Sequence, residues 1–121
     1  MITRMHSVAI FVHDLERATQ FYRDVLGIPV SNQGSFGLEL FPEPPHLGVH
    51  PAVHADAKAL VGRHTGVTLF VTGLVHFAGE LHAKGVRFVS EPTQMPWGIM
   101  AMVADPDGNI LALWEDEVPE S

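Results

Sequence analysis

The 121-residue sequence contains no cysteine. This absence excludes disulfide bonds, thiolate metal sites and a cysteine nucleophile, and it is compatible with a reducing compartment. The amino-terminal segment also lacks the basic and then apolar regions of a secretory signal. We therefore expect a cytoplasmic protein that is held together by its apolar core.

Basic residues are scarce: Lys and Arg number 7 against 14 Asp and Glu, so the formal net charge is −7. A nucleic-acid-binding surface requires a basic stripe, which this composition does not favour. No apolar run approaches the roughly 18–20 residues that a membrane span needs. No glycine-rich phosphate loop or dinucleotide fingerprint is present. We expect no nucleic-acid partner, no membrane partner and no nucleotide cofactor.

A duplicated pattern is the most informative feature that the sequence does contain. Residues 7–15 align without a gap on residues 66–74, and the two segments read SVAIFVHDL and GVTLFVTGL. Each copy continues through a helix-like stretch to a glycine, Gly27 or Gly85, and then to a second apolar run. A repeated unit that cannot bury its own sheet face is expected to pair with its copy. We therefore expect a single domain, 1–121, made of two modules, residues 1–53 and 62–121.

The spacing of apolar and turn residues predicts the element order βαβββ in each module. Short apolar runs bounded by turn residues predict strands, and apolar residues at helical spacing predict helices. Asp14 is expected to cap the first helix and Gly27 to end it. Residues 51–65 are expected to form a loop or a short helix. The second helix is expected over 74–84, and the strands over 6–12, 28–32, 35–41, 46–50, 66–72, 86–90, 99–104 and 109–115.

Alternation along the strands divides each of them into two faces. One face is aliphatic in the first, fifth and eighth strands and suits packing under a helix. The other face mixes small, polar and aromatic side chains, as the lining of a concave ligand pocket does. The residues on this mixed face are Ser7, Ala9, Phe11, Gly66, Thr68, Phe70, Ile110, Ala112 and Trp114.

Four motifs carry a family resemblance. They are VAIFVHDLE at residues 8–16, FYRDVLG at 21–27, PWG at 96–98 and DPDGN at 105–109. In this order and spacing, the sequence resembles the vicinal oxygen chelate superfamily, which includes glyoxalase I, bleomycin-resistance proteins, fosfomycin-resistance enzymes and extradiol dioxygenases. The resemblance implies an α+β fold in which two βαβββ modules form a pseudo-twofold, partly closed eight-stranded barrel with a central cleft. It does not imply one activity.

Metal-using members of that superfamily bind a divalent ion through His, Gln or Glu on the outer strands of the half-sheets, where the ion acts as a Lewis acid or activates dioxygen. The matching positions here are Ser7, Gly66 and Ala112, and the fourth is Gly48 or His50. Glycine and alanine offer no ligand atom, and serine is a poor substitute for imidazole or carboxylate. Because the sequence departs from the family at these positions, we expect a protein without the family's usual metal, with a divalent metal at a displaced site as the alternative.

The eight histidines of the chain are candidates for a metal or catalytic site outside the family's usual positions. Most of them are interpreted as exposed or hydrogen-bonded residues without a catalytic role. His50 is the exception, because strand alternation can aim its imidazole into the expected cleft, where it suits acid–base work. Glu39 could share that cleft, although a solvent-facing position is the competing interpretation. His6 precedes Ser7 and is expected to point to the opposite face of the strand, unless a local bulge reverses its direction.

Aromatic and sulfur-containing residues complete the candidate ligand site. Trp114 lies on the mixed face and Trp97 could close the cleft from a loop, and such rings stack on planar or apolar ligands. Met102 alternates with Met100 and offers an adaptable surface, with core packing as the competing interpretation. The candidate ligand-binding residues are Ser7, Phe11, Phe70, Trp97, Met102 and Trp114, and the catalytic candidates are His50 and Glu39.

Three functions are compatible with this sequence, and we favour the first. It is the binding of a small organic molecule in the cleft without the usual metal, in the manner of bleomycin-resistance proteins. The resemblance to those proteins also implies a homodimer. The second is a metal-dependent lyase, isomerase or dioxygenase with a displaced metal site that combines His50 with His6, Glu39 or His46. The third is a structural or regulatory module without a ligand, which only the missing metal ligands favour.

Overall fold

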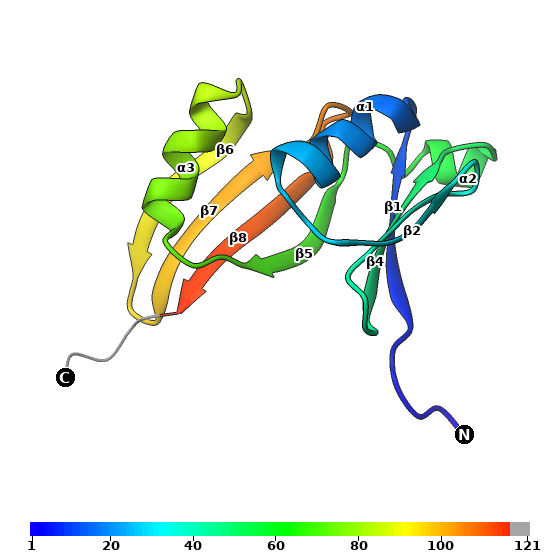
Figure 1. Ribbon diagram of the computed structural model, residues 1–121, viewed down its shortest axis with the longest axis horizontal. Coiled ribbons are helices and arrows are strands. Elements are labelled where there is room, and N and C mark those ends of the chain that lie inside the picture. Colours follow the sequence, from blue (N-terminus) through cyan, green and yellow to red (C-terminus); the bar gives the residue numbers. More distant parts are fainter. Residues whose placement is uncertain (117–121) are drawn as a thin grey trace. The chain divides into compact units, whose positions relative to one another are not determined.

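The structure, a computed structural model, describes residues 1–116. The chain divides into two compact units, Met1–Gly62 and Arg63–Ser121, which we call unit one and unit two (Figure 1). Each unit contains one four-stranded mixed sheet, so the α+β class with two βαβββ modules is confirmed. No helix in the described part of the chain is both long and apolar enough to cross a membrane.

The sheet of unit one has the strand order β1-β4-β3-β2. β1 runs parallel to β4, whereas β3 runs antiparallel to both β4 and β2. A helical segment connects β1 to β2, and its first part, α1, contacts β4. The elements are β1 (Ser7–Val12), α1 (Leu15–Thr19), the π-helical η1 (Gln20–Val25), β2 (Val30–Gly34), β3 (Gly37–Leu40), β4 (His46–Pro51) and α2 (Ala55–Lys58).

The core of unit one combines one face of this sheet with the helical segment. Because side chains alternate along a strand, every second residue of β1, β3 and β4 contributes to the same face. Phe21 and Tyr22 of η1 are buried as well, with ring centroids 5.0 Å apart. Burial of each large side chain contributes roughly 1.5–3 kcal/mol to stability. The buried aliphatic residues are Ile10, Val12, Leu38, Leu40, Leu47 and Val49.

The predicted helix signals of unit one are confirmed. Asp14 caps α1, since its Oδ1 accepts a hydrogen bond of 3.1 Å from the backbone N–H of Arg17. Gly27 follows the helical segment with φ at 71°, a left-handed conformation that costs glycine little. The second half of the segment is π-helical, with a 2.8 Å bond from the Leu26 N–H to the Phe21 carbonyl. The apolar spacing predicts the helix and its buried face, but not this wider turn.

Unit two repeats the arrangement with the strand order β5-β8-β7-β6. β5 runs parallel to β8, β7 runs antiparallel to both β8 and β6, and α3 contacts β6 and β8. The elements are β5 (His64–Phe70), α3 (Leu74–Ala83), β6 (Arg87–Met95), β7 (Gly98–Ala104) and β8 (Ile110–Asp116). Its buried core comprises Leu74, Ala78, Leu81, Ala101, Val103, Leu111 and Leu113.

The sixth strand differs most from the sequence prediction, which ends it at residue 90. β6 continues to Met95 and includes Pro92. Pro92 is tolerated because β6 is an edge strand whose pairing with β7 is interrupted between Ser90 and Thr93. Trp97 consequently lies in the turn between β6 and β7. The other strand limits differ from the prediction by one or two residues, and the segment expected to be a loop or short helix contains α2.

The turn between β7 and β8 is built around the carboxylate of Asp105. Its oxygens accept hydrogen bonds of 2.9 Å from the backbone N–H of Asp107, the backbone N–H of Asn109 and the Asn109 side-chain amide. Gly108 donates its N–H to the Asp105 carbonyl at 3.0 Å. Asp105 and Asn109 are only 5% and 0% exposed. The turn residues in the sequence predict this turn, and the hydrogen bonds explain why a carboxylate is tolerated at a buried position.

Replacing Asp105 with Ala is expected to lower the free energy of unfolding by about 2–3 kcal/mol, because it removes the acceptor of three hydrogen bonds from a buried turn. A urea titration followed by circular dichroism measures this change. The control is Glu43→Ala, which removes an exposed carboxylate from the loop between β3 and β4 and is expected to change the free energy by less than about 0.5 kcal/mol. Equal losses in the two variants would contradict the role assigned to Asp105.

Candidate functional site

The two units bring corresponding residues to corresponding places on their sheets. In unit one, Phe11 of β1 pairs with His50 of β4. In unit two, Phe70 of β5 pairs with Trp114 of β8. Since Phe11 and Phe70 also align in the gapless repeat, His50 of unit one corresponds to Trp114 of unit two.

This correspondence fixes the fourth position at which the resemblance places a metal ligand. Ala112 lies two residues before Trp114, so its counterpart is Gly48, two residues before His50. The cross-strand partners agree, because Gly48 pairs with Ala9 and Ala112 pairs with Thr68 at corresponding places in the repeat. The four positions are therefore Ser7, Gly48, Gly66 and Ala112, and three of these residues have no side-chain ligand atom.

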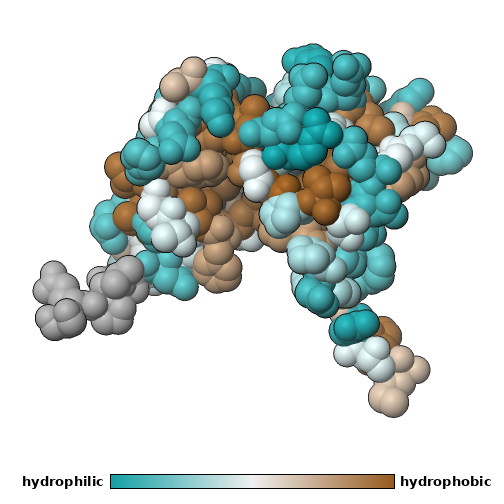
Figure 2. All heavy atoms as spheres, in the orientation of Figure 1, coloured by the Kyte–Doolittle hydropathy of each residue, from teal (hydrophilic) through white to brown (hydrophobic). Residues whose placement is uncertain are grey.

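Unit two carries an aromatic face on the side of its sheet opposite the aliphatic core. Trp114 is flanked by Phe70 on one neighbouring strand and by Met100 on the other. Trp97 stacks on Trp114, with ring centroids 6.3 Å apart and ring planes 13° from parallel. Figure 2 shows apolar side chains that reach the surface over the strands of unit two. We define the aromatic face as Thr68, Phe70, Trp97, Met100, Met102 and Trp114.

The aromatic face contains an open hollow of about 220 Å³ that is lined by Thr68, Phe70 and Trp114. This volume is below the roughly 300–1,000 Å³ of a pocket for a drug-sized ligand, so it suits a small molecule or one flat part of a larger one. Phe70 is 81% exposed and Trp97 is 55% exposed. Large apolar side chains that are exposed together mark surfaces used for binding.

Polar groups lie at the border of the aromatic face. The indole N–H of Trp114 donates a 2.8 Å hydrogen bond to Oδ1 of Asp116. Trp114 therefore satisfies its one donor at the ring edge and keeps its ring face for stacking. The hydroxyl of Thr68 supplies a further polar group in the wall of the hollow.

The corresponding face of unit one is polar rather than aromatic. The Nδ1 atom of His50 is hydrogen-bonded to the Phe36 carbonyl at 3.0 Å, and its ring centroid lies 6.4 Å from that of Phe11. The ring passes over Gly48, where an added Cβ would come within 2.6 Å of His50 Nε2. The glycine at this position thus makes room for the imidazole of His50.

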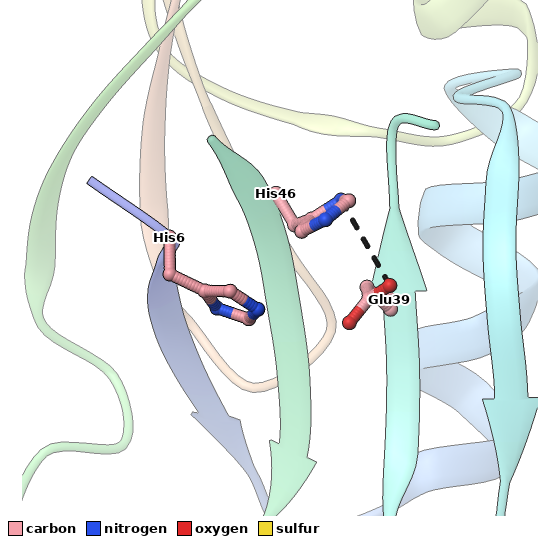
Figure 3. Close-up of side chains that lie close together, drawn as sticks. All are labelled: His6, Glu39 and His46. Atoms are coloured by element: carbon pink, nitrogen blue, oxygen red, sulfur yellow. Dashed lines mark ion pairs between the residues drawn. The ribbon is translucent and has the colours of Figure 1, made fainter. Parts of the chain in front are cut away.

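His6, Glu39 and His46 form a second polar group on unit one (Figure 3). In the part of the chain that the structure covers, these three side chains offer ligand atoms that all lie within 4.8 Å of one another. His50 does not belong to this group. The prediction that His6 points away from the face of Ser7 is wrong, since His6 Nδ1 and the Ser7 hydroxyl are hydrogen-bonded at 3.0 Å. The physical reason is that β1 begins at Ser7, so the side chain of His6 does not follow the alternation of the strand.

The residues singled out from the sequence fall into two groups. Sequence reasoning named His6, Glu39 and His46 as alternative partners of His50, but missed that these three meet one another, because that contact depends on the pairing of β3 with β4. Spacing along the chain carries no signal for this pairing across a proline-rich loop. The candidates Phe70, Trp97, Met102 and Trp114 belong to the aromatic face of unit two, whereas Ser7, Phe11, Glu39 and His50 belong to unit one.

Comparison with known proteins agrees with this architecture. The Bacillus subtilis (strain 168) uncharacterized protein YetH is 27% identical over 122 residues, which cover 95% of this chain and 100% of YetH. The solved structure of TnmS3, an antibiotic binding protein from Streptomyces sp. CB03234, is 26% identical with a TM-score of 0.74, covering 96% of this chain and 98% of TnmS3. A glyoxalase/bleomycin resistance protein/dioxygenase superfamily member from Sphaerobacter thermophilus DSM 20745 is 27% identical with a TM-score of 0.74, covering 95% of this chain and 98% of its own.

The sequence profile of one family matches residues 4–113, from the segment before β1 into β8. That family is the one that the repeat, the strand motifs and the DPDGN turn predict. The chain belongs to the Glyoxalase/Bleomycin resistance protein/Dioxygenase superfamily.

Proposed function

We propose that this protein binds a small, planar, apolar organic molecule on the aromatic face of unit two. The observation that carries the proposal is the open hollow lined by Phe70 and Trp114, with Trp97 stacked on Trp114. Aromatic side chains arranged in this way gain stacking and apolar burial when a flat ring covers them. The similarity to TnmS3, which is an antibiotic binding protein, supports a ligand of this class.

The composition of the face explains how one flat ligand is selected. The two indole rings are stacked with their planes only 13° from parallel, so a flat aromatic ligand is oriented to extend this stack. Met100 and Met102 lie beside Trp114 and Ala112 on the neighbouring strand, and their flexible thioethers adapt to the outline of a ligand. The Thr68 hydroxyl offers a hydrogen bond that orients a polar substituent.

The proposed binding does not use the family's usual metal. Gly48, Gly66 and Ala112 have no ligand atoms, and Ser7 offers only a hydroxyl. A ligand held by stacking and apolar contact needs no Lewis acid, so binding or sequestration is the function that these residues favour. We further propose the homodimer that the family resemblance implies, which light scattering on the purified protein measures.

The second candidate is a metal-dependent lyase, isomerase or dioxygenase with a displaced metal site. One observation favours it, namely the grouping of His6, Glu39 and His46. Two imidazoles and a carboxylate are a ligand set that divalent transition metals accept while positions for a substrate stay open.

A thermal-shift titration with small planar aromatic compounds, such as acridine derivatives, tests ligand binding. A compound present at about 100 times its Kd is expected to raise the Tm by roughly 8–15 °C, because it binds only the folded protein. Trp114→Ala is expected to abolish the rise. His76→Ala alters an exposed side chain of α3 and is expected to keep it. A full rise in Trp114→Ala, or no rise with any planar compound, would mean that the aromatic face is not the binding site.

Phe70→Ser separates binding from folding, because Phe70 is 81% exposed. The free energy of unfolding is expected to change by less than about 0.5 kcal/mol. The Kd for a planar ligand is expected to increase about 3–10-fold, since one stacking partner is lost. Fluorescence titration reports this Kd, because both tryptophans of the chain lie on the aromatic face.

Val75→Ser is the matched control for Phe70→Ser, since it removes an apolar side chain of 64% exposure from α3. Its Kd is expected to equal that of the wild type. If Phe70→Ser and Val75→Ser bind equally well, Phe70 takes no part in binding.

A further inference from the structure

The cluster of His6, Glu39 and His46 combines three potential metal ligands from three segments of unit one. Glu39 belongs to β3, His46 begins β4 and His6 directly precedes β1. Figure 3 shows the three side chains converging, with His46 Nδ1 3.8 Å from Glu39 Oε1, an ion pair when the imidazole is protonated. The side chains of His46 and Glu39 are 10% and 30% exposed, so the cluster is partly shielded from solvent. His6 is exposed and completes the cluster from its outer side.

The backbone places these residues together. Glu39 pairs with Gly48 across β3 and β4, and His46 lies two residues before Gly48 on the same face of the sheet. The His46 N–H donates a 2.8 Å hydrogen bond to the His6 carbonyl, which holds the segment before β1 against the start of β4. The backbone proximity of the three residues therefore follows from strand pairing and from this hydrogen bond.

Hydrogen bonds around the cluster orient each side chain. His46 Nδ1 lies 2.7 Å from the Phe41 carbonyl. Because a carbonyl only accepts, Nδ1 is the donor in this bond, and when the ring is neutral the lone pair that a metal needs is on Nε2. The Ser31 hydroxyl donates to Glu39 Oε1 at 2.9 Å. Side chains that bind a metal are typically oriented by hydrogen bonds of this kind to neighbouring groups.

Other His–Glu pairs in the described residues serve as a comparison. His76 pairs with Glu80 at 3.0 Å and His82 pairs with Glu91 at 2.8 Å, all four side chains being about half or more exposed. Exposed pairs of this kind contribute little to stability and need no ligand. The pair of Glu39 and His46 differs because a second imidazole, that of His6, stands beside it with ring centroids 5.3 Å apart.

We propose that His6, Glu39 and His46 bind one divalent transition-metal ion of the Zn²⁺ class. Tetrahedral zinc with bonds of about 2.0–2.1 Å places its ligand atoms roughly 3.3 Å apart, so side chains whose ligand atoms lie within 4.8 Å reach it by small rotations. His6 is exposed and lies just before β1, so its side chain is the least constrained of the three and makes the largest of these movements. Three protein ligands leave a further position for water or for an oxygen donor.

This site lies beside the family's usual positions rather than on them. Ser7 and Gly48 hold those positions on unit one, and neither is a ligand of the proposed ion. The proposal is independent of the aromatic face, because all three ligands belong to unit one.

Metal binding is measured on untagged protein that has been treated with a chelator and desalted. Calorimetric titration with Zn²⁺ and the visible absorption of added Co²⁺ are expected to show one ion per chain. His6→Ala and Glu39→Gln are each expected to weaken binding by about 10-fold or more. These two variants suffice, because His46 is largely buried and its replacement could disturb folding. Circular dichroism verifies that both variants keep the wild-type fold.

His76→Ala is the matched control, because it breaks an exposed His–Glu pair outside the cluster, and it is expected to bind Zn²⁺ as the wild type does. Absence of saturable binding, or equal binding by His6→Ala and the wild type, would overturn the proposal. The planar-ligand titration of His6→Ala is expected to match that of the wild type, so a failure of the metal site and a failure of the aromatic face give different results.

Discussion

In both units, burial of one aliphatic sheet face is the constraint from which the other features follow. Side chains alternate along a strand with a period of two, so a slip of one residue would move the whole aliphatic set into water. In unit one such a slip of β4 would expose Leu47 and Val49, which are 4% and 0% exposed. The register is therefore held by the core. The same register fixes which side chains lie next to one another on the opposite face, where the candidate binding residues are found.

The two units use these fixed positions differently. His50 of unit one and Trp114 of unit two occupy corresponding places, and so do Gly48 and Ala112. The strand beside them places Glu39 next to Gly48 in unit one and Met102 next to Ala112 in unit two. The face of unit one therefore carries imidazole and carboxylate groups, whereas the corresponding face of unit two carries aromatic rings and thioethers.

At two of the family's usual metal positions, Gly48 and Ala112, neighbouring side chains take the space that a chelating residue would need. At Gly48 the space for a ligand side chain is taken by the ring of His50, which comes within 2.6 Å of the Cβ position. At Ala112 a longer side chain would enter the surface that Met102 and Thr68 share with it. The two kinds of site that we propose lie next to these positions: an apolar one on unit two, and a displaced cation site at the start of β4.

Much of the fold could be predicted from the sequence, because its signals are local or repeated. The gapless repeat predicts both modules, Asp14 predicts a helix cap, and the DPDG segment predicts the turn before β8, all as the structure has them. The mixed face of unit two was predictable from alternation alone. The length of β6 was not, because its interrupted pairing around Pro92 is a tertiary feature.

The cation cluster was less predictable for a related reason. Glu39 and His46 are joined by the loop 41–45, and the number of residues in a loop does not specify which pair meets across the strands. His6 lies outside β1, so a rule for strands gives the wrong direction for its side chain. The alternation of apolar and polar residues along a strand does not predict contacts that depend on how distant strands pair. It also does not predict the direction of a side chain that lies just before a strand.

The central claim is that two corresponding sheet faces bind two different classes of ligand. Amide NMR spectra recorded during separate titrations with Zn²⁺ and with a planar aromatic compound test it most directly. We expect Zn²⁺ to shift the signals of residues around His6, Glu39 and His46, and the aromatic compound to shift those around Phe70 and Trp114. Shifts of one common set of residues by both ligands, or no shifts at either face, would contradict the account.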